Sequence, residues 1–323
     1  MTETSKKVNP VNNGLSGEEG FDFSVEETTT TKEEPTGKRE DTPKQERTAQ
    51  NITVQAGIQP QIPGDDAPFI VLCGPPTSGK SMVLKSLASY LYQSDLGYSI
   101  AANTTLLNTN KYQEDCRFFD GIIGDPDRRM PNTVDYLMAD IMDKGGNVVA
   151  HFLEAPGEDF FSLNNSAQEP NIPFKGYLEK VAQITIGKNR RVIYIILLDL
   201  DSETSLRNNA SLRDKYEKKM VKLYNRFVLH HPSRVILLYN KVDIPKNGIW
   251  ANTNGCKNLP AVMADAKSNY PHLFFKKKFL FWDIDDYKFL TYCTGSYPDD
   301  GGYTASGPTY PSVLWKEITK ILW

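Results

Sequence analysis

Short apolar runs alternate with amphipathic segments along most of the chain. Apolar runs typical of strands occur at residues 68–73, 148–153, 192–198 and 235–239, and the last two are of the kind expected for buried strands. Apolar side chains at helical intervals occur at 82–91, 205–229, 259–267 and 314–322. A further strand is expected at either 279–282 or 289–292. This alternation predicts an α/β fold, a mostly parallel sheet of about six strands with helices on both faces.

One stretch departs from the alternation of strand and helix and predicts a β-hairpin. Residues 134–141 alternate apolar and polar side chains, residues 143–147 have the composition of a turn, and 148–153 form the second strand. The predicted sheet therefore contains one antiparallel strand. The preceding segment, 97–132, is expected to be long and irregular, and loops of that length in compact domains commonly carry function.

The first 64 residues differ in composition from the rest of the chain. They are poor in large apolar side chains and rich in Glu, Thr, Lys, Asn, Pro and Gln. Such a segment cannot bury enough apolar surface to offset its conformational entropy. We therefore expect a disordered N-terminal tail at 1–64 and a single folded domain at 65–323.

Charge and cysteine content exclude some functions. The net charge of −3 comes from interspersed acidic and basic residues, so we expect neither nucleic acid nor anionic lipid as a main ligand. No apolar run is long enough for a signal sequence or a membrane span, which predicts a cytoplasmic protein with no integral membrane segment. The four scattered cysteines are expected to be reduced, structural thiols.

The sequence GPPTSGKS, residues 74–81, lies between a predicted strand and a predicted helix and indicates a phosphate-binding loop. In such a loop, backbone N–H groups converge on the phosphates, Lys80 reaches the β and γ oxygens, and the Ser81 hydroxyl ligates Mg²⁺. Pro75 and Pro76 have no N–H to donate. The residues that follow them still form a continuous run of donors.

A second motif, Asn240-Lys241-Val242-Asp243, follows the buried run at 235–239, at the end of a strand where open α/β sheets bind ligands. With the phosphate loop, it resembles the guanine-specificity motif of Ras-like, translation-factor-related (TRAFAC class) P-loop GTPases. The resemblance covers about residues 66–323 and implies a G-domain-like, three-layer fold of a bacterial type. It also implies that Asp243 accepts two hydrogen bonds from guanine, while Asn240 and Lys241 brace the base and the loop.

The resemblance extends to the loops that respond to the γ-phosphate. Thr133 precedes the predicted hairpin and Glu154-Ala155-Pro156-Gly157 follows it, at the places where the family has its two switch motifs. Thr294-Gly295 loosely resembles the last family motif, which contacts the guanine oxygen. The resemblance implies Ser81, Thr133 and Glu154 as metal ligands, and Lys80, Thr133, Gly157 and Glu158 as the catalytic group.

The chain departs from the family pattern near the γ-phosphate. Glu154 replaces the usual Asp, and Glu158 occupies the place of a Gln or His that orients the attacking water. An anionic Glu158 is repelled by the phosphate, and Pro76 crowds the same region, so we expect slow intrinsic hydrolysis. Arg128 and Arg129 are either an arginine finger supplied in cis or a solvated pair of loop charges.

The resulting hypothesis is a GTP-binding molecular switch with slow Mg²⁺-dependent hydrolysis, using GTP/GDP and Mg²⁺ and signalling to a protein effector or regulator. One alternative is a P-loop ATPase or small-molecule kinase that uses Asp199 as its Walker B carboxylate, and another is a GTP-bound scaffold that does not hydrolyse. The expected nucleotide-binding residues are Gly74, Thr77, Ser78, Gly79, Lys80, Ser81, Met82, Asn240, Lys241, Asp243, Thr294 and Gly295.

Overall fold

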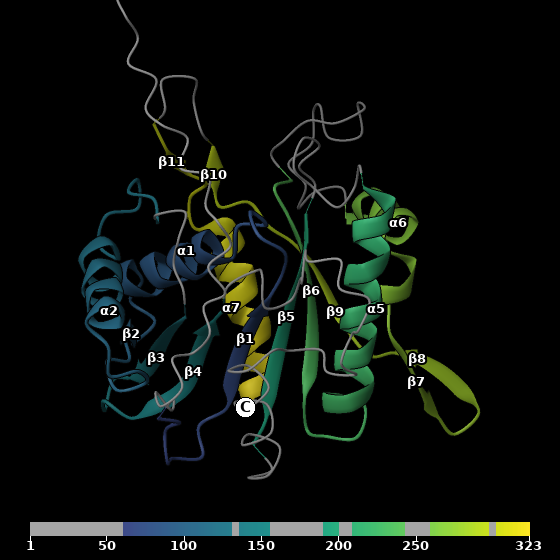
Figure 1. The fold of residues 1–323 in the computed structure, drawn as a ribbon, viewed down its shortest axis with the longest axis horizontal. Helices are drawn as coiled ribbons and strands as arrows, with labels where there is room; N and C mark the ends of the chain where they lie inside the picture. The colour runs from purple at the N-terminus through teal and green to yellow at the C-terminus, as the bar shows by residue number, and fades with distance from the viewer. Residues whose placement is uncertain (1–60, 131–135, 156–189, 200–208, 243–258, 297–301) are drawn as a thin grey trace, which may run out of the picture. The chain divides into compact units, whose positions relative to one another are not determined.

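A seven-stranded sheet in the order β2-β3-β4-β1-β5-β6-β9 organises the chain (Figure 1). The computed structural model describes residues 61–130, 136–155, 190–199, 209–242, 259–296 and 302–323. The strands of the sheet are β1 Phe69–Cys73, β2 Tyr98–Ala102, β3 Leu137–Asp143, β4 Val148–Glu154, β5 Val192–Asp199, β6 Arg234–Asn240 and β9 Lys288–Thr291. Within this sheet only β3 runs antiparallel to its neighbours. The predicted hairpin is therefore confirmed, and the sheet has seven strands rather than about six.

Helices cover both faces of the sheet. They are α1 Lys80–Gln93, α2 Asn110–Ile122, α5 Ala210–Phe227, α6 Leu259–Asn269 and α7 Thr309–Leu322, with a short 3-10 helix η1 at Pro271–Leu273. Helices α1 and α7 contact each other, and α5 and α6 both contact η1. Helix α1 leads from β1 to β2, at one edge of the sheet, and α5 leads from β5 to β6, toward the other edge. Because crossovers between parallel strands are right-handed, these two helices lie on opposite faces. The predicted three-layer α/β fold is confirmed.

The phosphate loop directly follows the central strand β1, which is buried on both faces and therefore holds the start of the loop in a fixed place. All five of its residues are buried, and β5 on one side of it contributes a second run of buried apolar side chains. Strands buried in this way read as continuous apolar runs rather than alternating ones, as the sequence of both strands does.

The segment 97–132 is not irregular, and that expectation was wrong. It contains β2 and α2, with Thr109 as the N-cap whose side chain accepts a hydrogen bond from the Tyr112 backbone N–H. One face of α2 is buried through Tyr112, Cys116 and Phe119, a helical spacing that the many charges around it conceal. Strand β2 lies at the edge of the sheet and buries only one of its five side chains, so it lacks a strong apolar pattern.

The C-terminal part supplies one strand of the main sheet and two small hairpins. The strand is β9, so the expected position at 289–292 is confirmed and the one at 279–282 is wrong. Residues 279–282 instead form the tip of a separate antiparallel hairpin of β7, Lys276–Phe279, and β8, Trp282–Asp285. A second short pair joins β10, Gly295–Ser296, to β11, Thr304–Ala305.

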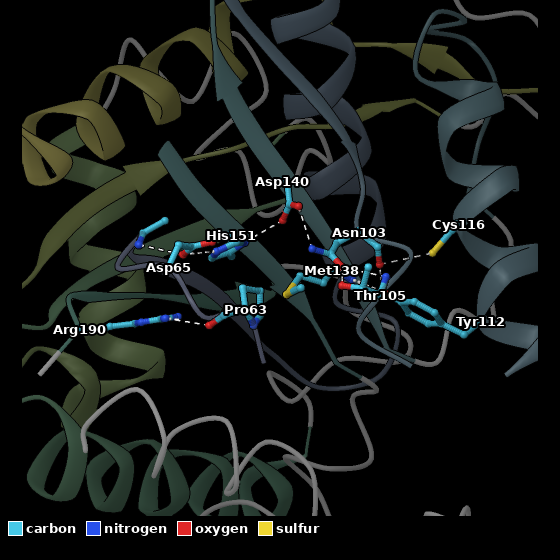
Figure 2. A network of polar contacts seen from close by, with 11 residues as sticks. Pro63, Asp65, Asn103, Thr105, Tyr112, Cys116, Met138, Asp140, His151 and Arg190 are labelled. Atoms are coloured by element: carbon cyan, nitrogen blue, oxygen red, sulfur yellow. Dashed lines mark hydrogen bonds and ion pairs between the residues drawn. The ribbon is translucent and has the colours of Figure 1, made fainter. Parts of the chain in front are cut away.

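A polar network ties the segment before β1 to the sheet (Figure 2). The ring of His151, on β4, bonds Asp140 of β3 through Nδ1 at 2.7 Å and Asp65 through Nε2 at 2.9 Å. Asp140 also accepts a hydrogen bond from Asn103 at 2.7 Å. The Pro63 carbonyl accepts from the Arg190 guanidinium at 2.8 Å. Contacts with the folded domain thus already begin before residue 65, and the boundary at 64 stays a prediction.

Two further expectations concern membrane segments and cysteines. None of the helices described has the length and apolar character needed to cross a bilayer. Cys73, Cys116 and Cys293 are buried and unbridged, and Cys256 lies outside the described residues.

Candidate nucleotide site

The loop between β1 and α1 has the backbone shape of a phosphate cradle. Strand β1 ends at Cys73, and α1 begins at Lys80 directly after Gly79, whose φ is 88°. Thr77 also has a positive φ, of 62°. The left-handed positions turn the chain sharply into the helix, so the amide groups of the first helical turn face the loop. No acidic residue lies in the first turn of α1, which leaves its positive end free to attract an anion.

Hydrogen bonds within the loop hold it in a tight shape. The Ser78 hydroxyl donates to the Pro75 carbonyl at 2.8 Å. The Lys80 amine, which is buried, donates to the carbonyls of Gly74 at 3.1 Å and Pro75 at 2.9 Å. Pro75 thus serves as an acceptor within the loop, although it has no N–H to offer a phosphate.

Asn240 joins the second motif directly to the phosphate loop. Its amide nitrogen donates to the Ser78 carbonyl at 2.8 Å, and the side chain is fully buried. A Cβ added at Gly79 would lie 2.7 Å from the same amide nitrogen, so the contact requires glycine there. Lys241, the next residue, has a φ of 59°, and Asp243 lies outside the described residues. The structure therefore brings together two residues that lie 162 positions apart in the sequence.

Glu154 and Ser81 form the part of the site suited to a cation. The Ser81 hydroxyl donates to Glu154 Oε1, and the other oxygen, Oε2, is buried without a hydrogen-bond partner among the described residues. Burial raises the pKa of Glu154 to about 7, although the Ser81 hydrogen bond and the Lys80 charge both oppose the rise. A hydroxyl and an underused carboxylate oxygen are hard ligands, of the kind that Mg²⁺ takes alongside water and phosphate oxygens.

A larger protein-only metal centre is not present in the part of the chain that the structure describes. No group of three or more His, Cys, Asp or Glu side chains is placed there to hold a metal ion. A Mg²⁺ ion that shares its shell with a nucleotide needs only one or two protein carboxylates, so the pair of Ser81 and Glu154 is sufficient.

Thr294 and Gly295 lie in a loop built around two close backbone contacts. The Thr294 carbonyl accepts hydrogen bonds from the Ser306 N–H at 3.1 Å and the Tyr303 hydroxyl at 2.5 Å. Gly295 has a φ of 151°, and a Cβ there would lie 2.2 Å from the Thr304 carbonyl oxygen. Close approach to β11 therefore explains this glycine without any ligand.

The loop carrying Thr294 also lies beside the end of β6. The Tyr292 N–H donates to the Tyr239 carbonyl at 2.7 Å, and the Val242 N–H donates to the Tyr292 carbonyl at 3.2 Å. The two segments that the resemblance assigns to the base are therefore neighbours, which sequence order alone does not establish.

Met82 and Lys85 connect α1 to the segment that leads toward Thr133. The Met130 N–H donates to the Met82 sulfur at 3.4 Å, which gives Met82 a structural role. The buried amine of Lys85 donates to the Asp125 carbonyl at 2.7 Å and to the Pro126 carbonyl, and burial lowers its pKa to about 8. Sequence reasoning missed Lys85, whose only signal is a cation placed on the apolar side of a helix.

Some of the remaining predicted residues lie outside the residues that the structure describes, and others lie within them. Thr133, Gly157, Glu158 and Asp243 lie outside the described residues. Asp199 ends β5, where it is paired in register with Asn240 at the end of β6. The guanidinium of Arg128 lies over the Phe118 ring of α2, 5.2 Å from the ring centroid.

The sheet order, the loop after β1 and the lysine that begins α1 define the fold of the P-loop NTPases. No protein-family model and no curated protein sequence matches the chain. Among solved structures, it is similar to Toc33 from Arabidopsis thaliana, crystallised with Mg²⁺ and GMPPNP. The two share 14% identity over 80% of this chain and 85% of Toc33, with a TM-score of 0.39.

Two further structures show similarity at the same level. The probable GTP-binding protein engB shares 13% identity over 79% of this chain and 98% of its own, with a TM-score of 0.35. The GTPase-like domain of S. cerevisiae Ski7, bound to GTP, shares 14% identity over 82% of this chain and 51% of its own, with a TM-score of 0.36.

Proposed function

We propose that the protein is a GTP-binding molecular switch with slow Mg²⁺-dependent hydrolysis. One observation carries the choice of guanine nucleotide: the side chain of Asn240 donates to the Ser78 carbonyl of the phosphate loop. A residue that only ended a strand would not need a buried amide aimed at the loop. The contact supports a role for the motif from Asn240 to Asp243 in holding the base next to the phosphates.

Each part of the site has a distinct task under this proposal. The loop amides and the Lys80 amine hold the phosphate oxygens, for which Lys80 exchanges its bonds to loop carbonyls. Asp243 accepts from guanine N1–H and the exocyclic amine, an arrangement of donors that adenine does not offer. Asn240 keeps the base-binding segment and the loop in register, and Thr294-Gly295 lies close to that segment.

The residues around Glu154 fit a magnesium ion. Ser81, Glu154 and Thr133 would hold it, with Glu154 reaching it directly or through a water molecule. When bound, Mg²⁺ neutralises charge on the β and γ phosphates. Since ligation requires the carboxylate form, the raised pKa of Glu154 predicts weaker magnesium binding as the pH falls below about 7.

Slow hydrolysis follows from the residues near the γ-phosphate. Glu158 stands where a neutral side chain normally orients water, and its charge is repelled by the phosphate. The γ-phosphate of GTP would order the loops that carry Thr133 and Gly157, and these loops would lose that order in the GDP state. A protein effector or regulator would respond to the difference. Single-turnover hydrolysis as fast as that of a self-sufficient GTPase would refute the slow-turnover part.

Base choice is tested by titrating the protein with fluorescent GDP, ATP and xanthosine diphosphate in the presence of Mg²⁺. We expect GDP to bind and ATP to bind at least a hundredfold more weakly. In Asp243→Asn the amide donates where the carboxylate accepted, so guanine binding falls and xanthine binding rises. Asp283→Asn, on the exposed hairpin, is the matched control and leaves both affinities unchanged.

The same titration, together with a binding and hydrolysis assay with GTP, decides between the proposal and its alternatives. Equal binding of ATP and GDP, unaffected by Asp243→Asn, would favour an ATPase or kinase that uses Asp199. Tight GTP binding with no hydrolysis, even with cell extract added, would favour a non-hydrolysing scaffold.

A further inference from the structure

The hairpin of β7 and β8 projects from the rest of the fold (Figure 1), and the side chains at its tip are apolar and exposed. The side chains of Leu280, Phe281 and Trp282 are 78%, 97% and 73% exposed, and that of Phe279 is 60% exposed. Isolated apolar residues are ordinary on protein surfaces, but four consecutive ones at the end of a projection are not. The tip needs an explanation that the nucleotide site does not provide.

The tip of the hairpin is apolar, and the charged residues lie further back along β7 and β8. The pairs Lys276–Asp285 and Lys278–Asp283 lie opposite each other on one face, and Phe279–Trp282 lie on the other. The two residues of the turn, Leu280 and Phe281, also have apolar side chains. The tip can therefore enter an apolar medium end first. The lysines of β7 and the aspartates of β8, which we call the collar, then stay outside that medium.

The two residues of the turn are of types that do not favour turns. A two-residue loop joins Phe279 to Trp282, and Leu280 has a φ of 55°. Glycine or asparagine is favoured at such a position, because a side chain there is strained in the left-handed conformation. Leucine and phenylalanine thus occupy places where polar residues would fold better, which points to a use for their apolar surface.

The base of the hairpin is anchored, so the tip is presented in a fixed place. The rings of Tyr224 on α5 and Phe275 stack at a centroid distance of 4.2 Å. Asp286 accepts a hydrogen bond from the Tyr224 hydroxyl at 2.7 Å and pairs with Lys277 at 2.5 Å. The hairpin precedes β9, at the amino end of the parallel strands, whereas the phosphate loop follows the carboxyl end of β1.

We propose that this tip inserts into the boundary between headgroups and acyl chains of a zwitterionic lipid bilayer. Phe and Trp side chains are stable at that depth. The collar matches zwitterionic headgroups, since its lysines complement the phosphates and its aspartates complement the ammonium groups. Because the collar carries as many aspartates as lysines, the binding needs no anionic lipid, consistent with the absence of a basic patch in the sequence.

A second copy of the chain fits the hairpin less well. Pairing β7 with β7 across a two-fold axis would set lysines beside lysines, and pairing β8 with β8 would set aspartates beside aspartates. Packing face to face would bury Phe279 and Trp282 but leave the outer side of the turn in water. A bilayer covers all sides of the tip at once.

The test is flotation of the full chain with vesicles of phosphatidylcholine and phosphatidylethanolamine, and with vesicles that also contain 30% phosphatidylglycerol. We expect binding of about 10⁴ M⁻¹, the strength of a single acyl anchor. It should differ less than threefold between the two vesicle types and between 0.1 and 0.5 M NaCl. The double substitution Leu280→Gly with Phe281→Asn should lower binding at least tenfold, and it suits the turn, so folding is preserved.

Trp323→Ser is the matched control, because it removes another exposed aromatic side chain, 76% exposed and outside the hairpin. It should bind vesicles as the unchanged protein does. Absence of binding to both vesicle types, or binding that the double substitution leaves unchanged, overturns the proposal. Binding only to anionic vesicles and lost in salt also overturns it. A dimer in sedimentation that the double substitution dissociates, without vesicle binding, assigns the tip to a second copy instead.

Discussion

At the scale of single residues, Gly79 is the most constrained position of the site. Its φ is 88°, and a Cβ would lie 2.7 Å from the Asn240 amide nitrogen. We predict that Gly79→Ala lowers the free energy of unfolding by about 1–3 kcal/mol, because it adds backbone strain and displaces a buried amide. Guanine nucleotide binding should fall by more than tenfold. Chemical denaturation and nucleotide titration measure the two effects.

Gly121→Ala is the control for that substitution. Gly121 lies near the end of α2, and an added Cβ meets nothing within 4 Å. Alanine should therefore stabilise the helix by about 0.5–1 kcal/mol and leave nucleotide binding unchanged. If both alanine variants behaved alike, the contact between Gly79 and Asn240 would not limit the site.

Glu154 predicts a link between pH, magnesium and stability. Its pKa rises from 4.5 to about 7 on folding, so it stabilises the fold below pH 4.5 and the stabilisation is lost as the pH rises through 7. Glu154→Gln keeps an acceptor for Ser81 without a buried charge. We expect the variant to exceed the unchanged protein in unfolding free energy at pH 8.5 by on the order of 2–3 kcal/mol, and to match it near pH 4.5.

The same substitution removes the proposed magnesium ligand. Nucleotide affinity of the unchanged protein should fall when EDTA is added, and that of Glu154→Gln should respond little. Denaturation at the two pH values and titration with and without EDTA measure both effects. An equal response to EDTA in the two proteins would place Mg²⁺ elsewhere.

At the scale of elements, the sequence predicts buried strands well and surface elements poorly. The runs that became β1, β5 and β6 are continuously apolar because both of their faces are covered. Strand β2 lies at an edge and α2 is rich in charge, so neither carries a clear apolar period. The run 279–282 is as apolar as a buried strand, but its side chains are exposed at the tip of a hairpin. An apolar run alone therefore does not distinguish a core strand from an exposed turn.

The segment before β1 is held by charge, and this predicts a dependence of its stability on pH. Burial alone lowers the pKa of His151, but hydrogen bonds to Asp140 and Asp65 outweigh it and raise the pKa. For Asp65, burial opposes the effect of His151 and the nearby Arg190, and the pKa is lowered. The attraction is complete below pH 6.5 and lost as the pH rises through the raised pKa of His151. It is also lost at low pH as Asp65 is protonated.

Asp65→Asn tests this network because the amide keeps a polar group beside His151 without the charge. At pH 6 the variant should unfold about 0.5–1 kcal/mol more easily than the unchanged protein, the size expected for a pair that is half exposed. The difference should shrink as the pH rises through the raised pKa of His151 and the histidine loses its charge. Asp66→Asn, one residue further on and exposed, should show neither effect. A difference that does not vary with pH would mean that the network acts through packing alone.

At the scale of the whole molecule, the candidate site is assembled from segments that sequence order does not place together. The glycine-rich loop and the motif ending at Asp243 are recognisable alone, because each keeps its chemistry in consecutive residues. Their contact through Asn240 and Ser78 depends on β1 and β6 being separated by only one strand, which the strand order determines. The link from Lys85 to the Asp125 carbonyl likewise depends on how α1 packs.

A site shared among several segments predicts that the nucleotide stabilises the whole domain. A ligand at a hundred times its dissociation constant adds about 2.7 kcal/mol to the free energy of unfolding. For a domain of this size that raises the melting temperature by roughly 5–10 °C. We expect this rise with GDP and Mg²⁺, a smaller one with GDP and EDTA, and almost none with ATP.

Lys80→Ala should abolish the rise in melting temperature because it removes the cation that we propose holds the phosphates. Lys278→Ala, which changes an exposed lysine of the hairpin, should leave the rise intact. Thermal denaturation followed by circular dichroism measures all the cases. An equal rise with ATP and GDP would contradict guanine specificity, and an undiminished rise in Lys80→Ala would place the nucleotide outside the loop. Since Asn240 and Lys80 contact the same loop from different elements, Asn240→Ala should reduce the rise with GDP as well.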